Sequence, residues 1–177
     1  MRVTGGILGG RRVEIPGGII RPAMDRMRES IFAFLGDLTG ASFLDMFSGS
    51  GIIALEAASR GANPVEAVEM DVKKRKTLLA NAAIAPVRIR CHFMAAELFV
   101  KRAKTGFDYI FCDPPFPYRF KRELVQAIAL SPLMGPGSRL LLHRPREEPL
   151  PEPSELLRLG DSKQYGRSVV DIFTIKN

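Results

Sequence analysis

The segment Phe107-Asp108-Tyr109-Ile110-Phe111-Cys112-Asp113-Pro114-Pro115-Phe116 carries the clearest structural signal in the chain. Its first six residues form a short apolar and aromatic run, which an acid and two prolines close. A run of this kind predicts a buried parallel strand. The strand would end at the carboxyl edge of a sheet, which is where open α/β sheets bind their ligands.

The residues that follow this strand indicate a chemistry. Pro114 and Pro115 have no backbone N–H, so the loop offers carbonyl acceptors and few donors. The carboxylate of Asp113 and the carbonyl of Pro114 would together hold a group with two N–H donors, such as the exocyclic amino group of a nucleobase. Phe116 would supply a ring on which that base stacks. Asp-Pro-Pro is equally compatible with a plain rigid exit from a strand.

The composition predicts one soluble domain with a polyanionic partner. The chain has 177 residues, 46% of them hydrophobic and 25% charged, and its 26 Lys and Arg outnumber 19 Asp and Glu, giving a net charge of +7. This excess favours nucleic acid. Arginine, which binds phosphate in a bidentate manner, is concentrated near the N-terminus. The arginines predicted to contact RNA there are Arg11, Arg12, Arg21, Arg26 and Arg28.

The cysteines and histidines predict no metal site. Cys91 and Cys112 both lie in apolar runs and are interpreted as reduced core thiols of a cytoplasmic protein. His92 and His143, the only histidines, are far apart in sequence, which disfavours a zinc site or a histidine-based triad. The N-terminus lacks the apolar core of a signal peptide, and no segment is long enough for a membrane span.

Alternating strand and helix patterns predict an α/β fold. Residues 1–40 would form an N-terminal extension, with a β-hairpin or extended arm over 1–20 and a helix that begins at 21–22 and ends before the glycine at 36. Residues 41–177 would form the main domain. Strands are expected at 42–47, 65–68, 87–93, 107–112, 139–143, 156–159 and 169–175, and helices at 52–60, 71–83, 95–104 and 123–130. This order predicts a mostly parallel seven-stranded, doubly wound sheet with an antiparallel last strand, and a hairpin turn within 160–168.

A glycine turn and an acid predict a nucleotide-like cofactor. The turn Ser48-Gly49-Ser50-Gly51 follows one strand and opens a helix, which places backbone N–H groups beside a ligand. Asp45 and Phe47 precede the turn. Glu69 ends the next strand, 18 residues after Gly51, where a carboxylate holds a ribose diol. The same features suit a nicotinamide cofactor, although no histidine or lysine is placed beside them for acid–base work.

A basic turn follows the Asp-Pro-Pro-Phe segment. Tyr118-Arg119-Phe120-Lys121-Arg122 interleaves aromatic rings with cations, a pattern that favours RNA or DNA binding and assigns Tyr118 and Arg119 to that surface. An ordinary helix start with solvated charges has the same composition.

Taken in order, these motifs resemble the class I S-adenosylmethionine-dependent methyltransferases. The nearer resemblance is to the bacterial RsmD family, whose members methylate N2 of a guanine in small-subunit ribosomal RNA. It covers nearly the whole chain. The matching blocks are Gly5-Gly6 with Gly10-Arg11, Arg21-Pro22-x-x-Asp25-Arg26-x-Arg28-Glu29, Leu44–Gly51, Leu55–Ala62, Asp113–Phe116 and Tyr165-Gly166.

The resemblance implies a Rossmann-like methyltransferase fold that binds S-adenosylmethionine and acts on small-subunit ribosomal RNA or a partly assembled small subunit. The protein is expected to be a monomer. The target base would contact Asp113, Pro114, Pro115 and Phe116. The cofactor would contact Asp45, Phe47, Gly49, Ser50, Gly51, Glu69, Met70 and Ala95. Many relatives carry an acid after the third strand, near the adenine. This chain has Phe93-Met94-Ala95-Ala96 there, so the adenine amino group is expected to use a backbone acceptor.

Two other functions stay open at this point. One is an adenine-N6 methyltransferase that acts on DNA or RNA, and the other is a non-enzymatic RNA-binding module with a decayed cofactor site. Phe116 and the N-terminal blocks favour guanine through the resemblance. The target nucleotide, and the choice between naked RNA and an assembled particle, are not specified by the sequence.

Overall fold

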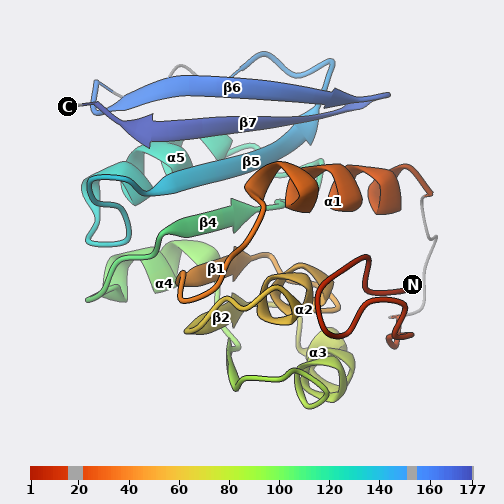
Figure 1. Ribbon diagram of the computed structural model, residues 1–177. Coiled ribbons are helices and arrows are strands. Elements are labelled where there is room, and N and C mark those ends of the chain that lie inside the picture. The colour runs from red at the N-terminus through yellow and green to blue at the C-terminus, as the bar shows by residue number, and fades with distance from the viewer. Residues whose placement is uncertain (16–21, 151–154, 177) are drawn as a thin grey trace.

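The computed structural model describes residues 1–15, 22–150 and 155–176 and contains one seven-stranded sheet (Figure 1). The strands are β1 (Phe43–Met46), β2 (Val65–Val68), β3 (Ile89–His92), β4 (Tyr109–Cys112), β5 (Arg139–Pro145), β6 (Leu157–Tyr165) and β7 (Ser168–Ile175). Their order is β3-β2-β1-β4-β5-β7-β6. Neighbours are parallel from β3 to β5, whereas β7 runs antiparallel to β5 and to β6. The predicted α/β architecture with an antiparallel last strand is confirmed.

Helices cover both faces of the sheet. They are α1 (Pro22–Leu35), α2 (Ile52–Ser59), the 3-10 turn η1 (Val72–Lys74), α3 (Arg75–Ala82), α4 (Ala96–Arg102) and α5 (Lys121–Leu130). Alternate residues of each strand pack into two different hydrophobic clusters, one on each face of the sheet, because successive side chains of a strand point to opposite faces. Phe43 and Phe111 pack with α1 and α2, while Leu44 and Ile110 pack with α4 and α5. This double coverage explains why the central strands are apolar at every position except Asp45 and Glu66.

The sequence pattern predicts that Met27, Ile31, Phe34 and Leu35 lie on one apolar face of helix α1, and the structure differs from this prediction at one position. Met27, Ile31 and Leu35 are buried as expected, but the buried phenylalanine is Phe32, and Phe34 is 40% exposed. Arg28, one turn before Phe32, is also buried, so the buried side of α1 extends from the 27–31–35 row toward positions 28 and 32. Position 34 lies at the opposite margin of that side.

The C-terminal hairpin is longer than predicted. Strand β6 continues past Leu159 to Tyr165 through a bulge at Gly160, and the turn is formed at Gly166, which has a φ of +59°. The apolar positions stop at Leu159, but the backbone ladder to β7 does not need apolar side chains, so polar residues extend the strand.

The N-terminal arm folds back on itself, as the hairpin prediction required. The amide of Val3 donates to the carbonyl of Arg11 (2.9 Å), and Arg2 forms an antiparallel bridge with Arg12. Gly6 is pressed against α2: a Cβ there would lie 2.0 Å from the Ser59 carbonyl oxygen, and its φ is +72°. Glycine is therefore required at this contact.

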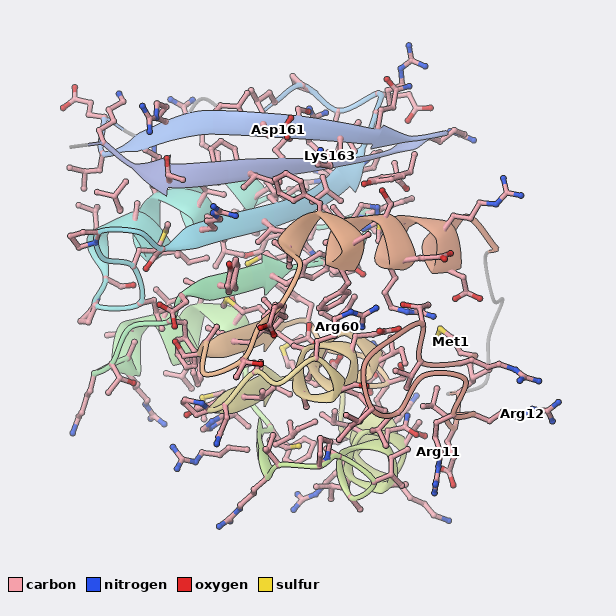
Figure 2. The ribbon with its side chains drawn as sticks, viewed as in Figure 1. Met1, Arg11, Arg12, Arg60, Asp161 and Lys163 are labelled. Carbon is pink, nitrogen blue, oxygen red and sulfur yellow. The ribbon has the colours of Figure 1, made fainter. Side chains whose placement is uncertain are left out.

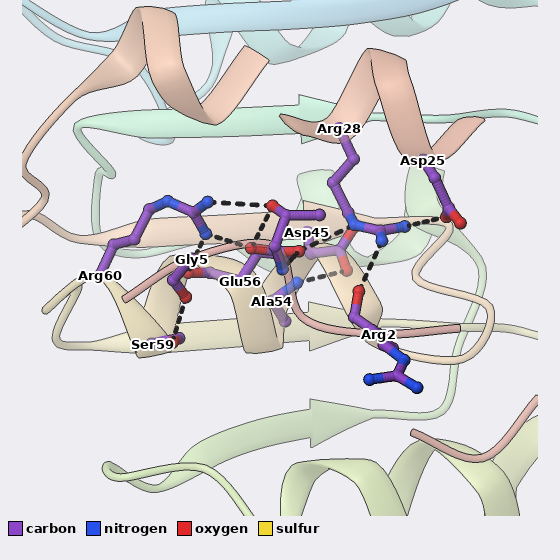
Figure 3. Close-up of polar contacts among 10 residues, drawn as sticks. Arg2, Gly5, Asp25, Arg28, Asp45, Ala54, Glu56, Ser59 and Arg60 are labelled. Carbon is purple, nitrogen blue, oxygen red and sulfur yellow. Dashed lines mark hydrogen bonds and ion pairs between the residues drawn. The ribbon is translucent and has the colours of Figure 1, made fainter. Parts of the chain in front are cut away.

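A buried ion network fixes the arm to α1 and α2 (Figure 3). Glu56 is fully buried and accepts hydrogen bonds from the Thr4 amide (2.6 Å), from Arg28 Nε (2.9 Å) and from the Arg60 guanidinium. Arg28 is 2% exposed and also donates to Asp25 (3.0 Å) and to the carbonyl of Arg2 (2.7 Å). The prediction that Arg28 contacts RNA is therefore wrong for this conformation, because its charge is used inside the protein.

No helix in the described part of the chain is long and apolar enough to cross a membrane.

Candidate active site

Strand register brings the site together at the carboxyl edge of the sheet. Met46 is aligned with Val68 and with Cys112, and Cys112 is aligned with Leu142. The residues that directly follow these four are Phe47, Glu69, Asp113 and His143. Residues separated by up to 96 positions in the chain (143 − 47 = 96) therefore meet at one edge because the strands are parallel and in register.

A cavity of about 700 Å³ opens at this edge. It is lined by most of the residues that the sequence assigned to cofactor and base, namely Phe47, Gly49, Glu69, Met70, Asp113, Pro114, Pro115 and Phe116. Tyr118, which the sequence assigned to RNA binding, also lines it. Four predicted cofactor residues, Asp45, Ser50, Gly51 and Ala95, do not line it. Lys74, Met94, Glu97 and His143 line it without having been predicted.

The turn after β1 has the backbone geometry that its glycines predict. Gly49 and Gly51 have φ values of +57° and +78°, and Phe47 adopts +62° although it is not glycine. Gly51 also packs closely against α3, since a Cβ there would lie 2.4 Å from Cδ1 of Leu78. The strained Phe47 lies in the cavity wall, which is where such strain concentrates in proteins.

Glu69 connects the glycine turn to the next segment. Its Oε2 accepts from the amide of Gly49 (2.8 Å), and its Oε1 accepts from the amide of Asp71 (2.7 Å). Lys74 Nζ lies 3.5 Å from Oε2. Each carboxylate oxygen can accept a further hydrogen bond, so Glu69 is fixed in place while keeping acceptor capacity toward the cavity.

Asp45 contacts the first turn of α2 and does not line the cavity. It is 1% exposed, and its Oδ2 accepts from the amide of Ala54 (3.1 Å). Its Oδ1 is buried and has no hydrogen-bond partner within the described residues. Burial, and secondarily the nearby carboxylates of Asp113 and Glu69, raise the pKa of Asp45 well above its usual range.

The Asp-Pro-Pro-Phe loop is held from both sides. On one side, Oδ1 of Asp113 lies 2.6 Å from Nδ1 of His143. On the other, the Lys121 ammonium donates to the carbonyls of Phe116 (3.3 Å) and Tyr118 (2.7 Å) and pairs with Glu148. Lys121 is 5% exposed, so this cation of the predicted RNA-binding turn is instead an internal support.

Glu97 corrects the expectation that the cavity lacks an acid after the third strand. It lines the cavity and accepts a hydrogen bond from the Tyr118 hydroxyl (2.5 Å). Partial burial of the ring, together with that bond, raises the pKa of Tyr118. Glu97 directly follows Phe93-Met94-Ala95-Ala96 and belongs to the first turn of α4, whereas the acid was expected in the loop before that helix.

The predicted RNA-contacting residues are only partly on one surface. Figure 2 shows the Arg11 and Arg12 side chains extending outward from the arm, and Arg26 and Arg119 are also exposed. Arg21 lies outside the described residues. In Figure 1 the arm, the start of α1 and the β6–β7 turn lie on the side toward which the parallel strands point, which is the side of the cavity.

The described residues contain no group of three or more His, Cys, Asp or Glu side chains that could hold a metal ion. Cys112 directly precedes Asp113 but is fully buried, and burial raises the pKa of its thiol far above the usual range. It therefore packs in the core as a neutral thiol and is unsuited to act as a nucleophile.

Comparison with known proteins places this chain in a family. The family model described as conserved hypothetical protein 95 matches residues 1–174. YlbH of Bacillus subtilis is 30% identical over 182 residues, covering 98% of both chains. The ribosomal RNA small subunit methyltransferase D of Escherichia coli is 33% identical over 131 residues, which are 72% of this chain and 66% of that protein.

Solved structures agree with the sequence matches. The structure of yhhF from Escherichia coli has a TM-score of 0.90 at 26% identity, covering 99% of this chain and 98% of that one.

A shorter sequence match links this chain to the tRNA1(Val) (adenine(37)-N6)-methyltransferase of Shewanella amazonensis, at 34% identity over 83 residues, which are 45% of this chain. The extent of the first matches, and the site that the fold assembles, show that the chain belongs to the RsmD family of methyltransferases, the family described as conserved hypothetical protein 95.

Proposed function

We propose that this protein transfers a methyl group from S-adenosylmethionine to the exocyclic N2 of a guanine in small-subunit ribosomal RNA. The observation that carries the proposal is the meeting of the Asp113–Phe116 loop, the Gly49 turn and Glu69 around one cavity. The groups that can accept hydrogen bonds from an amino group and those that can bind a nucleotide-like cofactor therefore line the same cavity. The proposal that the substrate is small-subunit ribosomal RNA rests on the RsmD-family relatives.

The residues present fit S-adenosylmethionine. A volume of about 700 Å³ suits a molecule of that size. Glu69, Asp113 and Glu97 line the cavity, so its charge favours a ligand that carries a sulfonium and an ammonium group. Glu69, whose carboxylate lines the cavity, would hold the ribose hydroxyls.

When bound, the cofactor supplies an electrophilic methyl group on a positively charged sulfur. The residues of the chain orient the acceptor nitrogen, whose lone pair is conjugated into the base and is a poor nucleophile. Asp113 and the Pro114 carbonyl would each accept one N–H of the amino group, which favours pyramidal geometry at nitrogen. Once the nitrogen has gained the methyl carbon it must release one proton, and the Asp113 carboxylate is placed to receive it.

Exposed cations are proposed to bind the RNA backbone. Arg11, Arg12, Arg26 and Arg119 would contact phosphates, and Phe116 would stack on the flipped base, an interaction of about 1–3 kcal/mol. Residues 1–40 would then act as an RNA-binding extension of the methyltransferase domain formed by 41–177. The substrate would be small-subunit ribosomal RNA or a partly assembled subunit, bound by a monomer.

An adenine-N6 methyltransferase is the second candidate. The partial match to a tRNA adenine-N6 enzyme favours it, since both reactions need acceptors for an exocyclic amino group. The two candidates differ in their product, which is N2-methylguanosine for the first and N6-methyladenosine for the second.

The test is transfer of tritiated methyl from S-adenosylmethionine to small-subunit particles and to bare ribosomal RNA from a methylation-deficient strain, followed by nucleoside analysis. Asp113→Asn is compared with Asp161→Asn, a matched change on β6, where the carboxylate pairs with Lys163 (3.1 Å) and accepts from the amide of Ser162 (2.8 Å) (Figure 2). Label in N2-methylguanosine that Asp113→Asn abolishes and Asp161→Asn keeps would support the proposal. Label in N6-methyladenosine would support the second candidate, and no label on any RNA would overturn both.

A further inference from the structure

His143 lies inside the candidate site although it is remote in sequence from the Asp-Pro-Pro-Phe motif. It is on β5 and 2% exposed, with Nδ1 2.6 Å from Oδ1 of Asp113. Its ring also meets Phe116 edge to face, with centroids 6.0 Å apart and planes at 63°. One buried side chain therefore contacts both the first and the last residue of the motif.

The hydrogen bond defines which nitrogen of the ring carries the proton. An ionised carboxylate has only acceptors, so a bond between Nδ1 and Oδ1 requires that Nδ1 carry the hydrogen. The other nitrogen, Nε2, is buried and has no hydrogen-bond partner in the described part of the chain. Asp113 is thus the single polar partner that the described residues offer to this ring, and the geometry is that of a donor aimed at one carboxylate oxygen.

We propose that His143 is a positioning residue for Asp113. The terminal torsion of an aspartate is broad, and the Asp113 side chain is 24% exposed, so its carboxylate can rotate unless one oxygen is held. By donating to Oδ1, His143 would leave Oδ2 as the oxygen that accepts the N–H of the target amino group. What Oδ2 does rests on the proposed function, whereas the hydrogen bond between the two side chains does not.

A purely structural role would be filling space beneath Phe116. The two roles separate with a pair of variants of nearly equal shape. In His143→Asn the side-chain amide nitrogen occupies about the position of Nδ1 and can still donate to Asp113. In His143→Leu a methyl group takes that position and cannot donate, while both variants lose the ring contact with Phe116 to the same extent.

The kinetic test measures methyl transfer to small-subunit RNA for the unsubstituted protein and both variants, with cofactor affinity and thermal unfolding measured in parallel. We expect His143→Asn to keep kcat within about threefold and His143→Leu to lower it about 10- to 100-fold, because misplacing a reacting group by about 1 Å has effects of that size. The KM for S-adenosylmethionine should stay within about twofold in both, since His143 lies next to Asp113 and not next to Glu69. Equal kcat values for the two variants would overturn the proposal.

A spectroscopic test addresses the hydrogen bond without any substrate. The chain has two histidines, so a protein labelled with ¹⁵N-histidine gives two imidazole signal sets. They are distinguishable because His143 is bonded through Nδ1, whereas His92 is bonded through Nε2 to Glu66 (2.6 Å). We expect a protonated, slowly exchanging Nδ1 in His143 that is lost in Asp113→Ala, with the His92 signals unchanged.

The two tests fail in different ways. If the unsubstituted protein methylates no RNA, the proposed function fails, and the spectra still decide whether His143 donates to Asp113. If His143 is protonated at Nε2 and not at Nδ1, or if Asp113→Ala leaves its signals in place, the positioning role is overturned even though methylation proceeds.

Discussion

Glu56 is the residue whose removal should most directly detach the N-terminal arm from the domain. Its carboxylate is fully buried and receives the Thr4 amide together with the guanidinium groups of Arg28 and Arg60 (Figure 3). The variant Glu56→Gln keeps the shape of the side chain and removes the charge. Two buried or partly buried cations then lose their common counter-ion.

The magnitude follows from the burial of these partners. Removing one member of a buried ion pair destabilises a protein by about 3–5 kcal/mol. The lower value is expected here, because Arg28 keeps Asp25 at 3.0 Å and the Arg60 side chain is 13% exposed and partly solvated. About 3 kcal/mol corresponds to a fall in Tm of about 6–12 °C for a domain of this size. The amide of Thr4 should also exchange hydrogen faster, since its acceptor becomes a weaker one.

The assay is thermal unfolding together with native-state hydrogen exchange, with Glu147→Gln as the matched control. Glu147 pairs with Arg167 on the surface, where both side chains are more than half exposed, so its loss should change stability by no more than about 1 kcal/mol. If Glu56→Gln lowers Tm no more than the control, or if Thr4 exchange is unchanged, the interpretation of this network as the anchor of the arm is refuted.

Three further predictions concern the cavity. Because burial raises the pKa of Asp45, the folded protein holds that proton more tightly than the unfolded chain, so stability falls as pH rises above about 3.9, the pKa of an unfolded aspartate. Asp45→Asn should therefore raise Tm at neutral pH, with a gain that shrinks toward pH 3; a gain independent of pH would contradict this. Glu69→Gln should weaken S-adenosylmethionine binding about 10- to 100-fold in calorimetry, as expected for lost hydrogen bonds to a charged group of about 1.5–3 kcal/mol, while an unchanged affinity would remove Glu69 from the cofactor site. Lys121→Met should lower kcat for methyl transfer with little effect on cofactor affinity, because the carbonyls of Phe116 and Tyr118 lose their donor; equal kcat would show that the loop holds its shape alone.

Local patterns determined the elements and the motif positions. The apolar run before Asp113 and the glycine turn after Asp45 identified two strands, their ends and the edge at which a ligand would bind. The sequence of strands and helices also determined the doubly wound sheet with its antiparallel last strand. These features depend on residues close together in the chain, for which the physical preferences of glycine, proline and apolar side chains are strong.

The roles of individual charged residues were decided by tertiary structure. Arg28 and Lys121, like the exposed Arg11, are basic residues in segments that the sequence pattern assigned to RNA binding. The fold nevertheless buries Arg28 and Lys121 against carboxylates and carbonyls. His143 was not assigned a role because it lies far from His92, the other histidine, in the sequence. The strand register identifies it: Cys112 is aligned with Leu142, so the residue after Leu142 lies beside Asp113.

The physical reason is the range of the interactions. Whether a chain segment is helix or strand is set mainly by neighbouring residues, so the sequence alone was sufficient for the sheet and for the Asp-Pro-Pro-Phe loop. Whether a cation faces RNA or a buried glutamate depends on which segments pack together, and burial of a charge is tolerated only where the fold supplies its partner. The meeting of Glu56 with the arm, and of His143 with Asp113, exists only once the strands are in register.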